Sequence, residues 1–500
     1  MVYFLGVLLL LSILGFVFYA VKGKNLMVGF FIVTLLWFIV GLVGNAFIKD
    51  GEFANGFFDV FDGKDLIGHR TGVEAFLYAL NNVFQVGPAN YAQSILVNIF
   101  FGALFGQILI KTKIASTVVK KTVELSGDRP RITLALMCIV TTLLFVNMSG
   151  IGPVMAIAVI VFPILKTLGI PSPVACFAFM GSIMAGLMIN PVNFAQYYGI
   201  ILGSVKGLEG ILGSDFVQAF SNFTYSDWSA KFGWVAAGVS LFIVLIATNL
   251  AMGFKKKTYS WGLSLTEQQD NVKDAPWYSW FAILIPVVLL TIFGLLPGWT
   301  ARNGDVIKFT GFAPIFAFIV AGLYALITTG NMRGGYHSNC VKLSKMFSDG
   351  VVDVAPMVGF LLTLAMFGQV GAINAPYLRA IVQDLFPSTA LALALVFAVI
   401  SFASFFRGPT NMVGAGGAAF VTIVLISVGS NAVALGVVFV YALFAILTIA
   451  IQHLDITQSW VAWGLGYTNV SSKQFMKMAI PTGYLTASLL CILAFLMLAL

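Results

Sequence analysis

The chain has 500 residues, of which 60% are apolar and only 9% are charged. Its mean hydropathy of +0.98 and its lack of charge exclude an ordinary soluble protein, a disordered chain and a small disulfide-stapled fold. The apolar residues gather in blocks of about 18 to 22, long enough to cross a bilayer as helices. The net charge of +8 comes from short loops between these blocks, so it indicates membrane topology and no nucleic-acid partner. We predict an all-α polytopic protein, embedded by multiple passes in the lipid bilayer of a bacterial inner (plasma) membrane.

Two apolar runs, 2–21 and 26–48, open the chain. No cationic stretch precedes the first run and no small-residue cleavage site follows it, so we expect a retained helix and not a signal peptide. The loop between the two runs carries Lys22 and Lys24, whereas residues 49–74 hold six acids against three basic residues. The first loop is therefore expected in the cytoplasm and the second outside.

The next run, 92–110, leads to a basic segment, residues 111–131, that is again expected in the cytoplasm. Residues 132–170 form an apolar stretch of 39 residues, about 58 Å as one helix, which is too long for a single span. After the run 232–253, the polar residues 258–276 resemble the central cytoplasmic loop of a carrier. Further runs bring the expected total to roughly 10–12 transmembrane segments, and they lie at 277–296, 309–328, 351–372, 389–406, 415–428, 432–452 and 480–500.

Polar and helix-breaking residues interrupt the apolar runs at four places. The interruptions lie at Asn147–Pro153, Arg407–Gly417, Asn190–Gln196 and His453–Ser459. Short motifs in and near these interruptions recur at nearly one spacing in the sequence. Phe105-Gly106-Gln107 returns 262 residues later as Phe367-Gly368-Gln369, and Asn193-x-x-Gln196 returns at the same spacing as Asp455-x-x-Gln458. The basic loop 111–131 maps onto residues 373–393, where only Arg379 and Asp384 are charged.

This pattern predicts two repeats of inverted topology, built from broken helices or re-entrant hairpins with a site where the breaks meet. We divide the chain into an N-terminal helix pair (1–48), a first transport repeat (49–257), the central loop (258–276) and a second transport repeat (277–500).

Broken helices expose backbone groups that suit small ions, because half-helix N-termini attract anions while half-helix C-termini and freed carbonyls attract cations. Arg407 lies inside an apolar run, and its planar guanidinium suits a carboxylate. An arginine that only snorkels from a helix end is the structural alternative. The predicted substrate-binding residues are Asn147, Ser149, Gly150, Arg407, Thr410 and Asn411.

Asp455 is the second charge inside an apolar context. It could carry a coupling proton, ligate sodium, or serve as a salt-bridge partner of Arg407. The amides of Asn190, Asn193 and Gln196 either line the site or bond neighbouring helices. The predicted coupling-ion residues are Asn190, Asn193, Gln196, Asp455, Thr457 and Gln458. No cofactor is expected, and sodium is the only metal ion considered.

The pattern Gly102-x-x-x-Gly106-Gln107, a basic loop and the broken run through Asn147–Pro153, repeated with Gly368-Gln369 and Arg407–Gly417, resembles bacterial permeases of the ion transporter superfamily. These include gluconate, citrate and C4-dicarboxylate carriers. The resemblance implies helical hairpins, an elevator-type motion, a homodimer, and uptake of small carboxylates coupled to protons or sodium. The Ser-Asn-Thr motif of the divalent-anion/sodium symporters is replaced by Pro409-Thr410-Asn411, which leaves the coupling ion and the carboxylate open.

The predicted function is cation-coupled symport of a small organic anion. Enzymatic chemistry is not expected, since the sequence has no nucleophile motif, metal-ligand spacing or phosphate-binding loop. A mono- or hydroxycarboxylate is the expected substrate. A cation/proton antiporter that depends on Asp455 and has no organic substrate is the main alternative. A membrane subunit that transports nothing by itself is the third.

Overall fold

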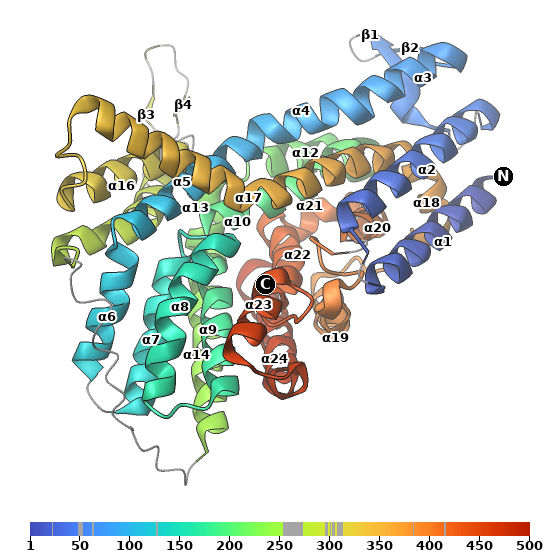
Figure 1. Ribbon diagram of the computed structural model, residues 1–500. Coiled ribbons are helices and arrows are strands. Elements are labelled where there is room, and N and C mark those ends of the chain that lie inside the picture. Colours follow the sequence, from blue (N-terminus) through green and yellow to red (C-terminus); the bar gives the residue numbers. More distant parts are fainter. Residues whose placement is uncertain are drawn as a thin grey trace.

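The computed structural model describes residues 1–22, 24–48, 54–62, 65–126, 129–253, 274–295, 299–300, 302, 306–307, 314–383, 385–414 and 417–500. These residues are mainly helical (Figure 1). Two short antiparallel β-hairpins add to the predicted all-α architecture, one of β1 (Asp59–Asp62) with β2 (Asp65–His69) and one of β3 (Trp299–Thr300) with β4 (Val306–Ile307). Most of the predicted central loop 258–276 lies outside the described residues.

The remaining elements fall into three groups along the chain. The N-terminal group is α1 (Val2–Val21), α2 (Leu26–Phe47) and the short η1 (Gly56–Phe58). The first repeat contains α3 (Gly72–Asn81), η2 (Asn82–Val86), α4 (Gly87–Tyr91), η3 (Ala92–Leu96), α5 (Val97–Lys111), α6 (Ile114–Ser126), α7 (Pro130–Phe145), α8 (Ile151–Thr167), α9 (Ser172–Leu187), α10 (Pro191–Gly207), α11 (Glu209–Leu212), α12 (Ser214–Ser221), α13 (Tyr225–Trp228), η4 (Ser229–Gly233) and α14 (Trp234–Met252).

The predicted second repeat, residues 277–500, opens with three helical elements: η5 (Trp277–Ile283), α15 (Ile285–Leu295) and α16 (Pro314–Thr328). It continues with α17 (Tyr336–Ile373), α18 (Ala375–Val382), α19 (Ala390–Ile400), η7 (Ser401–Arg407), α20 (Gly417–Val428), η8 (Gly429–Asn431), α21 (Ala432–Leu435), α22 (Val437–Gln452), α23 (Ser459–Thr468) and α24 (Ser472–Leu498).

Among the described helices, five are long and apolar enough to cross a membrane, and three bent helix pairs raise this number to eight. Five shorter apolar helices remain, including α7, α8 and α22. They are short because the breaks divide the long apolar runs. The number of complete membrane spans depends on how these short helices pair across the bilayer. The predicted total of 10–12 transmembrane segments therefore stays a prediction.

Each repeat contains a long helical arm, and the two arms lie antiparallel. The first arm extends from α3 to α5, and the second is α17; Figure 1 shows them side by side, with the chain running in opposite directions. Gly87 of the first arm packs against Gln369 of the second, while Gln107 contacts Asp353. Both arms also end four residues after the repeated Phe-Gly-Gln motif, at Lys111 and Ile373. The two arms are thus inverted relative to each other, as the predicted repeat of opposite topology requires.

The four predicted breaks are confirmed. Helix α7 ends at Phe145 and α8 begins at Ile151, so the 132–170 run is divided where its polar residues lie. Helices α9 and α10 are bent by 65° across residues 188–190. In the second repeat, η7 ends at Arg407 and α22 ends at Gln452, and each is followed by irregular backbone.

The N-terminal pair packs on the second repeat, with α1 against α18 and α2 against α17. Close approach depends on small residues, because a side chain at Gly44 would overlap the ring of Tyr377. Two buried amides complete this contact: Asn374 Nδ2 donates to Trp37 O at 2.8 Å, and Asn55 Nδ2 donates to Ile373 O at 2.6 Å. The end of the second arm is therefore clamped between α2 and the loop that follows it.

We predict that Asn190→Ala destabilises the fold by roughly 2–4 kcal/mol, because this side chain makes four hydrogen bonds at two breaks. Its Oδ1 caps α10 by accepting from the backbone N–H of Val192 and Asn193, and its Nδ2 donates to Phe145 O and Met148 O. The midpoint of thermal unfolding in detergent measures the loss.

Asn25→Ala is the matched control, because Asn25 caps the exposed start of α2 through two backbone N–H groups and makes no described contact with another break. We expect a loss of about 1 kcal/mol there. Equal shifts for the two variants would contradict the role given to Asn190.

Candidate functional site

The first repeat brings its two breaks together around Asn190. The residue is 1% exposed, and its amide bridges the end of α7 to the start of α10. Asn147 is also fully buried, and its Nδ2 donates to the carbonyl oxygen of Ile283 in η5. Gly150 precedes α8 with φ of 96°, a conformation that glycine adopts without strain. Asn190 thus bonds backbone carbonyls at the end of α7, Asn147 ties the break to η5, and Gly150 allows the turn into α8.

The second repeat brings Arg407, Asp455 and Gln458 together. The backbone N–H of Arg407 donates to Asp455 Oδ2 at 2.8 Å, and its guanidinium Nη2 donates to Gln458 Oε1 at 3.2 Å. Thr457 donates twice to Asp455 Oδ1, from its backbone N–H at 2.9 Å and from its hydroxyl at 2.8 Å. Asp455 thus fastens two breaks to each other, through main-chain groups more than through the guanidinium.

Thr410 and Asn411 fold the break that follows Arg407. Their partners lie in η7: the Thr410 hydroxyl meets that of Ser404 at 2.5 Å, and Asn411 Nδ2 donates to Ser404 O at 3.3 Å. Asn411 Oδ1 also accepts from the backbone N–H of Val413. Both side chains are buried, so in this conformation they shape the turn around the arginine.

Several buried polar atoms at the breaks have no hydrogen-bond partner among the described residues. They are Asn147 Oδ1, Ser149 Oγ, Asn193 Nδ2, Arg407 Nε and Gln458 Nε2. Burying such atoms without a partner costs free energy, unless water or a ligand meets them. Unsatisfied groups therefore gather at both sets of breaks, which makes the breaks the candidate binding site. Gln196 is likewise buried, one turn after Asn193.

The two repeats meet beside these breaks. Tyr197 of α10 donates its hydroxyl to Gln452 Oε1 of α22 at 2.7 Å. Tyr197 follows Gln196, and Gln452 precedes the break at His453. Among the described residues, no hydrogen bond joins 147–150 to 407–411, so the predicted meeting of Asn147 and Arg407 in one pocket stays a prediction.

A carboxylate that the sequence analysis did not select lies at the start of α8. Asp353 of α17 accepts a hydrogen bond from Gln107 Nε2 of α5 at 2.6 Å, and its carboxylate rests on Gly152, where a side chain would overlap it. Asp353 falls within the apolar run predicted at 351–372, and an acid there was the signal that could have revealed it. It connects both arms to the first break.

The other reactive residues have ordinary environments. The ring of His453 stacks on Trp460 with the centroids 5.0 Å apart. Cys138, Cys176 and Cys491 are buried free thiols, and Cys340 is exposed. In the part of the chain that the structure describes, no three His, Cys, Asp or Glu side chains gather in a way that could hold a metal ion. A cation at the breaks would instead be bound by neutral oxygens such as Asn147 Oδ1 and Ser149 Oγ.

No family model and no curated protein matches the sequence. Solved structures share its fold. The YdaH transporter of Alcanivorax borkumensis, described as having an unusual topology, aligns over 93% of this chain and 98% of its own, with 12% identity and a TM-score of 0.60. MtrF of Neisseria gonorrhoeae, described with a class of antimetabolite efflux pumps, aligns over 94% of each chain, with 14% identity and a TM-score of 0.61.

These likenesses show that the chain has the polytopic helical fold found in transporters. Neither structure is described as a gluconate, citrate or C4-dicarboxylate carrier. The comparison therefore supports a transporter fold, and it leaves the narrower resemblance to those carriers without support.

We predict that Gly152→Ala displaces the Asp353 carboxylate from α8, breaks its bond to Gln107 and costs roughly 1–3 kcal/mol of stability. Thermal unfolding in detergent measures the loss. Gly106→Ala is the control, because a side chain there meets only Pro153 Cγ at 3.8 Å, an ordinary contact. If the overlap is the cause, Gly152→Ala should cost much less in an Asp353→Ala background, whereas additive losses would rule this cause out.

Proposed function

We propose that the chain is a secondary active transporter that moves a small organic anion, coupled to a proton or sodium gradient. A mono- or hydroxycarboxylate is the proposed substrate. The break after η7 would bind its carboxylate, and the oxygens at the first break would take part in cation coupling. The overall fold, shared with YdaH and MtrF, supports transport.

The observation that carries this proposal is the state of Arg407. Its side chain lies within a broken apolar run, and the described ion pairs do not include it. Only its Nη2 has a described partner, the neutral oxygen of Gln458, and its Nε is buried without one. A guanidinium in this position retains donors for a carboxylate, which it can bind through two parallel hydrogen bonds.

Antiport of cations without an organic substrate would place the function on Asp455. Both oxygens of that carboxylate are occupied by the three donors of Arg407 and Thr457. A group that exchanges a proton or binds sodium must give up some of these bonds in each cycle. The arrangement favours a role for Asp455 in holding the arginine, so organic-anion transport remains the better supported function.

We predict that Arg407→Lys lowers uptake at least roughly ten-fold, because an ammonium keeps the charge but cannot form the two parallel bonds. Purified protein in lipid vesicles would be offered radiolabelled lactate, gluconate, citrate and benzoate under an imposed sodium or proton gradient. Cation movement would be recorded in the same vesicles with fluorescent indicators.

Arg129→Lys is the matched control, because Arg129 is exposed at the start of α7 and its described hydrogen bond uses only its backbone carbonyl. Full uptake by Arg407→Lys would refute the role of Arg407. Cation flux without uptake of any organic acid would instead establish the antiporter, and the absence of both fluxes would remove transport by this chain alone.

A further inference from the structure

A large polar cavity lies away from the breaks, on the side of the molecule where β1 follows η1. Its volume is about 740 Å³, and its walls come from the loop 54–59, η2, α4, the end of α10, α11, the end of α17 and α18. The acidic character of residues 49–74 predicts that this side faces outward. The cavity is large enough for a small organic molecule with its water.

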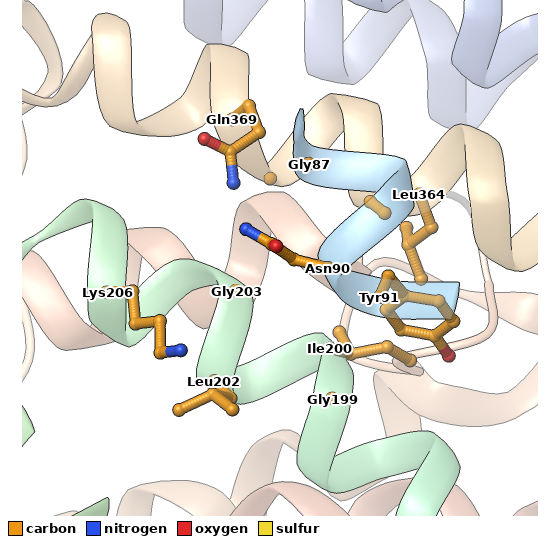
Figure 2. A pocket seen from close by; sticks show the side chains of 12 residues that line it. Gly87, Asn90, Tyr91, Gly199, Ile200, Leu202, Gly203, Lys206, Leu364 and Gln369 are labelled. Carbon is orange, nitrogen blue, oxygen red and sulfur yellow. The ribbon is translucent and has the colours of Figure 1, made fainter. Parts of the chain in front are cut away.

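A smaller cavity of about 70 Å³ adjoins the large one, and Asn90, Lys206 and Gln369 line both. Figure 2 shows the polar ends of these three side chains pointing into the same space between α4, α10 and α17. Gly203 and Gly368 also line the small cavity, and a side-chain carbon at either would have no atom within 4 Å. Glycines on two helices thus leave this space open beside the amides and the ammonium.

The charges in this region favour an anion. Lys206 and Arg379 line the large cavity, and among the described residues neither has an ion pair. Of the two acids in its wall, Asp59 is held by His69 Nδ1 at 2.7 Å, and Glu209 is exposed. Two cationic side chains therefore face one carboxylate that has no described partner. A concave surface of this kind raises the local concentration of anions.

We propose that Lys206, Arg379, Asn90 and Gln369 form an anion-binding vestibule, distinct from the Arg407 site, that takes up the carboxylate of a small organic acid. The ammonium and the guanidinium would supply the charge, and the amide of Gln369 would donate a hydrogen bond to a carboxylate or hydroxyl oxygen. As an entry station for the substrate this inference rests on the proposed function. The preference of the cavity for anions does not rest on the proposed function, because it can be measured without transport.

A thiol introduced at position 203 tests the vestibule directly. A Gly203→Cys variant, made in a Cys340→Ser background, places one accessible thiol in the cavity without a clash, because the other three cysteines are buried. The second-order rates of two methanethiosulfonate reagents, the anionic ethylsulfonate and the cationic ethyltrimethylammonium, are then compared on purified protein. Gly466→Cys is the reference, since a side chain there also meets nothing within 4 Å and α23 lines neither cavity.

We expect the anionic reagent to be favoured at Gly203→Cys relative to Gly466→Cys, and Lys206→Gln to lower this preference roughly ten-fold, about three-fold for each reagent. Lys231→Gln, which removes an exposed lysine of η4 outside the cavity, should leave it unchanged. Equal preferences at the two thiols, or no effect of Lys206→Gln, would overturn the vestibule while leaving Arg407 as the transport site.

An uptake assay is the second test of the vestibule. It uses the organic acid that is taken up fastest by the vesicles. Lys206→Gln should raise the KM several-fold at an unchanged maximal rate, whereas Arg407→Lys should lower uptake at least roughly ten-fold at every substrate concentration. An unchanged KM would refute the role of the vestibule as an entry station. If the thiols show the anion preference but no organic acid is transported, the proposed function fails and the anion site stands.

Discussion

The structure depends on satisfying the backbone polar groups that four helix breaks expose within apolar surroundings. Lipid cannot bond to these groups, and each one left without a partner costs several kcal/mol. In the first repeat the amide of Asn190 meets this requirement at two breaks. In the second repeat the carboxylate of Asp455 meets this requirement, because it accepts hydrogen bonds from the main-chain N–H groups of Arg407 and Thr457. The two repeats thus meet the same requirement with different chemistry, at positions that do not correspond in the repeat.

This difference between the repeats suggests a division of labour. The neutral amide of Asn190 leaves unpaired oxygens nearby on Asn147 and Ser149, which suit a cation. The carboxylate of Asp455 accompanies an arginine whose remaining donors suit an anion. The Tyr197–Gln452 hydrogen bond directly links the two repeats.

The antiparallel arms form the frame around these breaks. Gln107 and Gln369 occupy equivalent places in the two arms, but their surroundings differ. Gln107 is bonded to Asp353 at the start of α8, where the packing is tight. Gln369 borders the open cavity with Lys206 (Figure 2). The repeat symmetry is thus broken by a carboxylate at one glutamine and by an open space lined by Lys206 at the other.

The sequence by itself determined the class of fold, the places of the breaks and the repeat. A helix of 39 apolar residues cannot fit a bilayer, and Asn, Gly and Pro in its middle left one place to divide it. The partners of the breaks were decided mainly by the tertiary structure, because a hydrogen bond such as that from Asn190 Nδ2 to Phe145 O joins residues far apart in the chain. Asp353 and Lys206 escaped notice for the same reason. A single charge near the end of an apolar run looks like a topology signal until another helix is packed against it.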